Sequence, residues 1–148
     1  MKARVGTKQL EIAGLVGAAR TNNFPDILFF AGGKVTTASL EAKFRIRLTL
    51  RNGTESDTIK KWNESLKSVP GGYGNMFEAK LLKRDLVEGD ELEIKFEVDT
   101  GHGYEQWTPV DVQTVEGPPN TPAFSAVAFL FDNGQGVSGL VSLAYLNA

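Results

Sequence analysis

The sequence contains no cysteine and only one histidine, His102. Without cysteine the chain forms no disulfide, holds no metal through thiolates and has no cysteine nucleophile. With a single histidine, one chain cannot supply a site that requires two imidazole groups. The sequence also lacks any apolar run close to the roughly 18 residues that a membrane-spanning helix needs. We therefore expect no membrane span.

An excess of charge of one sign is missing as well. The chain has 16 Lys and Arg residues against 18 Asp and Glu residues, which gives a formal net charge of −2. Proteins that bind nucleic acid need a surplus of positive charge to replace the counterions of the phosphates, so we expect no nucleic-acid partner. The best candidate for the apolar part of a secretory signal, residues 12–19, is short, is interrupted by glycine and follows Glu11. We expect no such signal, which favours a cytoplasmic location or an assembled particle.

The length of 148 residues suits one domain, and we predict a single domain over residues 1–148. Apolar and charged residues alternate most regularly over residues 43–51 and 91–99, the pattern of strands with one buried and one solvated face. We predict that the apolar set of these two strands is buried: Phe44, Ile46, Leu48, Leu92, Ile94 and Phe96.

Further strands follow from shorter patterns. Gly32 and Gly33 predict a hairpin turn after a strand over residues 26–31. The segment from Lys8 to Ala19 fits either a strand or a helix, and Gly14 and Gly17 favour the strand. The turn chemistry of residues 132–136 predicts a hairpin. The remaining predicted strands cover residues 35–40, 76–82, 107–115, 123–131 and 137–146.

One segment has helical periodicity. Ile59, Trp62, Leu66 and Val69 recur at spacings of three, four and three residues, which forms one apolar stripe on a helix. Pro70 and the two glycines after it would end such a helix. We therefore predict an all-β fold, an antiparallel β-sandwich (jelly-roll-like), with one short inserted α-helix near residues 55–69.

Two charged stripes admit two interpretations. The outward positions of residues 43–51 carry Lys43, Arg45, Arg47 and Arg51, whereas those of residues 91–99 are mostly acidic. The cationic stripe would suit an anionic ligand. If the two strands are neighbours, the stripes would instead pair across the sheet, at roughly 0.2–1 kcal/mol for each opposite-charge pair. The near-cancellation of the charges favours pairing.

The segment of residues 99–107 is the candidate ligand-binding loop. Aromatic rings pack against sugar rings, and carboxylates accept hydrogen bonds from sugar hydroxyls. A loop that gathers both residue types suits a glycan, although large aromatic residues at strand starts, such as Trp107, usually anchor the loop in the core. The candidate ligand-binding residues are Asp99, His102, Tyr104, Glu105 and Trp107.

Enzymatic and metal-dependent functions find no support in the sequence. No serine lies in a Gly-x-Ser-x-Gly elbow, and Asp132 and Asn133 offer fewer oxygens than calcium needs. We expect no catalytic residues, no metal and no cofactor. We predict a non-enzymatic, lectin-like carbohydrate-binding module with a glycan ligand.

The alternative function is a structural or assembly subunit, such as a phage or virion component or another homo-oligomer. It would use the apolar C-terminal hairpin, residues 123–146, because large exposed apolar patches mark interfaces. We expect the contact with another subunit to lie among the apolar residues of this hairpin: Val127, Phe129, Phe131, Val141, Leu143 and Tyr145.

Overall fold

The structure is a computed structural model that describes residues 1–7, 9–18, 26–36, 41–53, 57–67, 77–117 and 124–146. Most of it is β-strand, and Lys83–Asp85 form a 3-10 turn. The strands are β1 (Lys2–Val5), β2 (Gln9–Ile12), β3 (Leu15–Ala18), β4 (Ile27–Val35), β5 (Lys43–Asn52), β6 (Asp57–Lys67), β7 (Phe77–Leu81), β8 (Glu91–Asp99), β9 (Tyr104–Gln106), β10 (Asp111–Glu116), β11 (Phe124–Asp132) and β12 (Val137–Tyr145).

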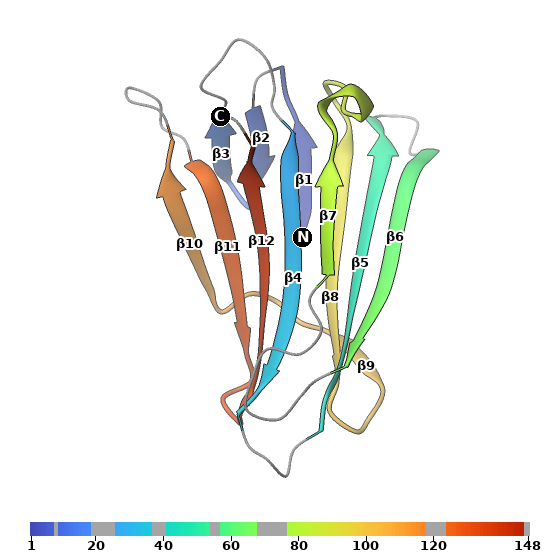
Figure 1. Ribbon diagram of the computed structural model, residues 1–148, viewed down its shortest axis with the longest axis vertical. Helices are drawn as coiled ribbons and strands as arrows, with labels where there is room; N and C mark the ends of the chain where they lie inside the picture. The colour runs from blue at the N-terminus through green and yellow to red at the C-terminus, as the bar shows by residue number, and fades with distance from the viewer. Residues whose placement is uncertain are drawn as a thin grey trace.

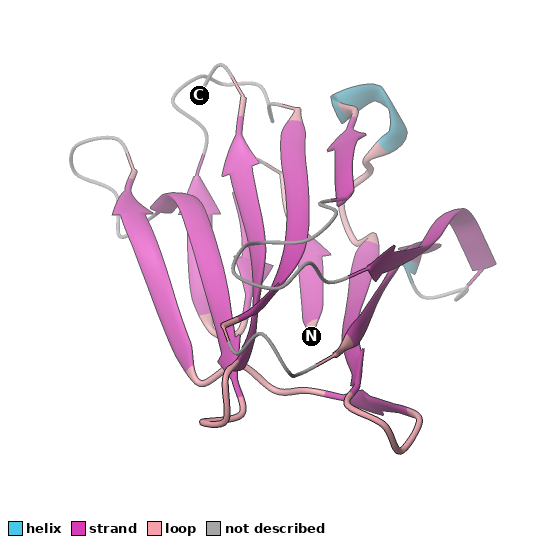
Figure 2. Ribbon diagram, turned by 60° about the horizontal axis from the view of Figure 1, so that its bottom comes forward, coloured by secondary structure: helices cyan, strands magenta, loops and turns pink. Residues whose placement is uncertain are grey.

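The strands form one continuous hydrogen-bonded sheet that curls almost into a closed cylinder (Figures 1 and 2). Its main path runs in the order β6-β5-β8-β1-β2-β3-β11-β12-β4-β7, and β9 and β10 add to β8 and β11. Neighbouring strands are antiparallel except at Phe124 and Gly17, where β11 meets β3 in parallel. The predicted all-β class is confirmed.

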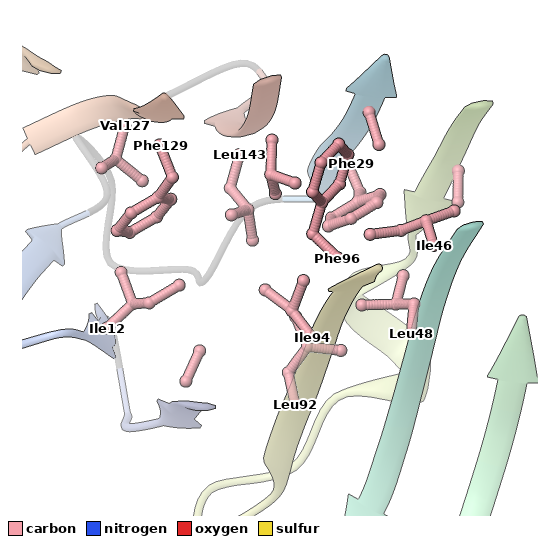
Figure 3. Close-up of a cluster of buried hydrophobic side chains, with 14 of the residues drawn as sticks. Ile12, Phe29, Ile46, Leu48, Leu92, Ile94, Phe96, Val127, Phe129 and Leu143 are labelled. Atoms are coloured by element: carbon pink, nitrogen blue, oxygen red, sulfur yellow. The ribbon is translucent and has the colours of Figure 1, made fainter. Parts of the chain in front are cut away.

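The core lies inside the curl and is lined by the inward positions of the strands. The six residues predicted to be buried are at most 1% exposed. Figure 3 shows Ile46, Leu92 and Phe96 pointing toward Phe129 and Leu143 from the other half of the sheet. The Phe96 ring stacks on Phe131 at a centroid distance of 4.5 Å. One apolar cluster therefore connects both halves of the sheet.

The predicted helix near residues 55–69 is wrong. Residues 57–67 form strand β6, which pairs with β5 from Asn52–Asp57 to Lys43–Lys67. Of the apolar stripe, Trp62 packs half-buried against the core, whereas Ile59 is 47% exposed. A long neighbouring strand offered a complete hydrogen-bond ladder, and this tertiary pairing overrode the local periodicity. Residues 54–56 and 68–76, which include the predicted end of the helix at Pro70, lie outside the described residues.

The predicted hairpin turn at Gly32 and Gly33 is also wrong, because β4 continues through both glycines to Val35. A Cβ atom built on Gly33 would lie 2.5 Å from the ring of Phe44. Glycine is required here for close packing across the core rather than for a turn. Most of the strand predicted after this turn lies outside the described residues.

Other turns agree with the sequence pattern. The ambiguous segment forms the hairpin β2–β3, with Ala13 and Gly14 at positive φ between the strands. The predicted turn between β11 and β12 is confirmed as well. There the Asp132 carboxylate accepts a hydrogen bond from the Gly134 N–H at 2.7 Å. This side-chain acceptor holds the tight turn together with the backbone bond from the Asn133 N–H to the Val137 carbonyl at 3.1 Å.

Candidate functional site

The loop between β8 and β9 is organised by Asp99. Its Oδ1 atom accepts hydrogen bonds from the backbone N–H groups of Gly101 at 2.7 Å and Gly103 at 3.1 Å. The bond from Gly101 is the main cause that lowers the pKa of the Asp99 carboxyl below its ordinary value. Both glycines have positive φ, a conformation that L side chains rarely adopt. The loop is thus preorganised, with His102 exposed between the two glycines.

Tyr104 lies at the start of β9, directly opposite Asp99 in the ladder. The guanidinium carbon of Arg45 lies 4.1 Å from the centroid of the Tyr104 ring, which is a cation–π contact. The same guanidinium binds Glu97 with two parallel contacts, Nε to Oε1 at 3.3 Å and Nη2 to Oε2 at 3.0 Å. One face of the Tyr104 ring is therefore occupied by a side chain that is itself held in place.

The remaining predicted residues lie elsewhere around the strand. Because side chains alternate along a strand, Tyr104 shares the outer face with Asp99, whereas Glu105 and Trp107 point to the opposite side. Trp107 is partly buried against the core, and its backbone N–H donates to the backbone carbonyl of Phe96 at 2.9 Å. Glu105 is exposed. The structure therefore brings Asp99 and Tyr104 together and separates Glu105 and Trp107 from them.

The charged stripes pair across the sheet. Strands β5 and β8 are antiparallel neighbours, with Arg45 opposite Glu97. Arg47 also approaches Glu97, with its Nε 2.9 Å from Oε1. The Nε–H group of Arg47 is not aimed at that oxygen. The contact is therefore an ion pair and not a hydrogen bond. Lys95 faces Arg47 in the ladder but turns toward Glu93, at 3.5 Å. Arg45, Arg47 and Lys95 are thus engaged by carboxylates of the same surface.

The arginine stack on Tyr104 was missed by sequence reasoning. Arg45 and Tyr104 are far apart in the chain and belong to strands that both pair with β8. The alternation showed that Arg45 faces outward, but only the strand order shows which aromatic ring lies above it.

A second surface, on the opposite half of the sheet, carries almost no charge. We call it the uncharged face, and it consists of the outward positions of three adjacent strands, β4, β11 and β12. Each of these positions is partly exposed or, at Gly32, buried. Lys34 and Asp132 mark one end of it. Between that end and the other, the register places these residues side by side: Leu28, Phe30, Gly32, Ala126, Ala128, Leu130, Ser138, Leu140, Ser142 and Ala144.

The predicted contact residues of the C-terminal hairpin do not belong to this surface. Those residues point inward and are at most 9% exposed: Val127, Phe129, Phe131, Val141, Leu143 and Tyr145. They are core residues and are not available to another subunit. The sequence signal for the uncharged face was the lack of charge at the intervening positions of both strands.

A cleft of about 270 Å³ lies between the β1–β2 hairpin and the turn before β8. Its polar lining comes from Arg4, Gln9, Glu11 and Glu88, none of which belongs to the predicted loop. Over the described part of the chain, no group of three or more metal-ligating side chains comes together. Within the same residues, no helix has the length and apolar character that crossing a membrane requires.

Comparisons of the chain with protein-family models, curated proteins and solved structures yield no significant match.

Proposed function

We propose that the protein is a structural subunit that assembles with itself through the uncharged face of β4, β11 and β12. The observation that carries this proposal is the absence of charge at the central outward positions of three adjacent strands, among the residues that the structure describes. An apolar surface rimmed by polar residues is typical of an interface. Here the rim contains Lys34, Asp132, Glu78 and Lys80.

The chemistry of this face suits a second copy of the same chain. Burying a charged surface against another copy removes water from its ions at a cost in free energy, whereas two copies of an uncharged surface bring no charges together. Alanine and serine at Ala126, Ala128 and Ser142 let two sheets approach closely, with Phe30 as the largest protruding side chain. Sheets that pack face to face lie about 10 Å apart. A contact of a face with itself is closed and produces a dimer.

The test places a charge at the centre of the face. Ala128 lies opposite Ser142 of β12, so Ala128→Lys would bring two ammonium groups into the contact. We expect the wild-type chain to sediment as a dimer or larger species at micromolar concentration and Ala128→Lys to lose this contact. Gln106→Lys on the charged half is the matched control and should assemble like the wild type. A wild-type chain that stays monomeric, or equal assembly of Ala128→Lys, would contradict the proposal.

Glycan binding through the loop of residues 99–107 is the second candidate function. The observation that favours it is the order of the loop, because Asp99 fixes two backbone N–H groups and leaves His102 and Tyr104 at its surface. Arg45 is already bound to Glu97, so affinity would come from ring packing and would change little with salt. On a glycan array, Tyr104→Ala should lose the binding shown by the wild type, while Glu105→Gln should retain it. Unchanged binding by Tyr104→Ala would exclude this loop as the site.

The finer description of the fold also stays a proposal. We propose a single domain of the antiparallel β-sandwich type, jelly-roll-like, over residues 1–148. What supports it is that the inward side chains of both halves of the curled sheet contribute to one core.

A further inference from the structure

The exposed large apolar side chains concentrate at two edges of the sheet. Within the described residues there are five of them, and one, Val87, lies in the turn before β8. Val112 and Val115 belong to β10 and are 40% and 61% exposed, and Val110 directly precedes that strand. The fifth, Ile59, lies on β6. Four of the five therefore lie on or beside two strands, β10 and β6.

Strand β10 is exposed on both of its faces. All six of its residues are exposed, although it pairs along its whole length with β11. Val112 lies opposite Phe129 on the inner side, and Val115 lies opposite Ala126 on the outer side. A partner that packs against one face of the sheet covers only one of these valines. A strand that adds to the edge covers both, because it brings side chains to both faces.

Strand β6 is the matching edge on the other flank. It pairs with β5 on one side, and no described strand pairs with its other side. Figure 1 shows β10 and β6 at opposite flanks of the molecule. One copy therefore carries two separate edges with exposed apolar side chains, and no described strand pairs with the outer side of either edge. Such an edge is a template for pairing with another chain.

The charges of the two edges are complementary. Strand β10 carries Asp111 and Glu116 and no basic residue. Strand β6 carries three lysines against Asp57 and Glu64, a net charge of 3 − 2 = +1, with Lys60 and Lys61 adjacent near its middle. Pairing β10 with β10 brings together two acidic segments. Pairing β10 with β6 brings together segments of opposite charge.

We propose that β10 of one copy pairs with β6 of the next copy, so that the sheet continues from one subunit into another. The contact joins two different surfaces, so it is heterologous and leaves a free β6 edge and a free β10 edge at the ends of every assembly. Assembly by this contact continues beyond a dimer unless it closes into a ring. It uses none of the residues of the uncharged face and stands independently of the function proposed above.

Two charge-reversal variants test the pairing. The first carries Asp111→Lys and Glu116→Lys and has a basic β10 edge. The second carries Lys60→Glu and Lys61→Glu and has an acidic β6 edge. All four side chains are exposed, so we expect both variants to fold with the circular dichroism spectrum of the wild type. Ala128→Lys is added to every chain, so that the uncharged face does not contribute to the measured mass.

In this background, sedimentation velocity should show growth with concentration for the chain that is unaltered at both edges. Each charge-reversal variant alone should show at least a tenfold weaker association. A mixture of the two should assemble again, because the basic β10 of one then meets the acidic β6 of the other, and native mass spectrometry should find both chains in each complex. Lys83→Glu with Arg84→Glu, two exposed residues away from both edges, is the matched control and should associate like the unaltered chain.

Three results would overturn the pairing of β10 with β6. The first is unchanged assembly of the β6 variant together with loss in the β10 variant, which indicates that β10 pairs with itself. The second is a mixture that assembles no better than its two components. The third is an Ala128→Lys chain that stays monomeric while the wild type forms a dimer, which supports the uncharged face and excludes the edge contact.

Discussion

On β5 and β8 nearly every outward position is charged, whereas on β4, β11 and β12 the central outward positions are alanine, serine, glycine, leucine and phenylalanine. The inward positions of both halves are equally apolar and contribute to one core. The two halves therefore differ only in what they present to the outside. The inward residues determine that the sheet folds, and the outward residues determine what each half contacts.

Charged side chains on the outer face of β5 and β8 form ion pairs with one another. Glu97 binds Arg45 and lies within ion-pair distance of Arg47, and Lys2 lies 3.5 Å from Glu91. Ion pairs of this kind keep a surface hydrated and discourage contact with other sheets. The apolar side chains of the uncharged face cannot form ion pairs, so burial by another subunit, as proposed above, would gain free energy.

The largest expected effect tests whether the two halves share one core. Phe96 of the charged half stacks on Phe131 and lies 6.0 Å from Phe44, centroid to centroid. We expect Phe96→Ala to lower the free energy of unfolding by about 3–5 kcal/mol, with one cooperative transition in urea. Phe77, which is only partly buried, is the control, and Phe77→Ala should cost less. Two separate transitions would show that the halves unfold independently.

A smaller effect is expected where the two halves touch most closely. Gly139 of β12 faces Phe96, and a Cβ atom there would collide with the ring. We expect Gly139→Ala to destabilise the protein by about 1–3 kcal/mol through overpacking. Adding Phe96→Leu to Gly139→Ala should make the pair less destabilised than the sum of the single changes. Ser138→Ala, at the neighbouring outward position, is the control and should be nearly neutral. If the effects of Gly139→Ala and Phe96→Leu on stability simply add, the contact between the two residues is contradicted.

The contribution of ion pairs within the charged surface of β5 and β8 to stability can be measured at Glu97. Its side chain is 13% exposed and serves two arginines. We expect Glu97→Gln to lower stability by about 1–2 kcal/mol, because two partly buried guanidinium groups lose their counterion. Glu105→Gln, at an exposed carboxylate of the next strand, is the control and should change stability little in the same urea titration. Equal values for the two variants would refute a special role for Glu97.

The smallest expected effect concerns stability at alkaline pH and the inward residue Tyr145 of β12. Burial raises the pKa of the Tyr145 hydroxyl far above its ordinary value of 10. The folded state therefore keeps the proton while the unfolded state loses it, so stability is fully present below about pH 10 and is lost above it. The loss approaches about 1.4 kcal/mol for each pH unit. Tyr145→Phe removes this contribution, so between pH 9 and about pH 11 the wild type should lose more stability than the variant. Equal losses of stability in the wild type and in Tyr145→Phe would contradict a contribution from the Tyr145 hydroxyl.

Much of the fold is readable from alternation. Over residues 43–51 and 91–99 every second residue is apolar and the residues between them are charged, except Thr49, so one register satisfies both core and water. The same logic failed at β6. Ile59 and Trp62 have helical spacing, but a full hydrogen-bond ladder with β5 stabilises this segment as a strand. The logic also failed at Gly33, because the ring of Phe44 that requires the glycine comes from another strand.

For the candidate sites, the sequence by itself determined which side chains are present and which of them alternate. It was sufficient to place Asp99 beside two glycines whose N–H groups it binds, since this contact spans only four residues. The tertiary structure alone decided that Arg45 covers Tyr104, that Glu105 and Trp107 turn away from it, and that ten small or apolar outward positions adjoin on β4, β11 and β12. The physical reason is that strand order depends on the packing of the whole core, while each strand's own pattern specifies only which of its sides faces inward.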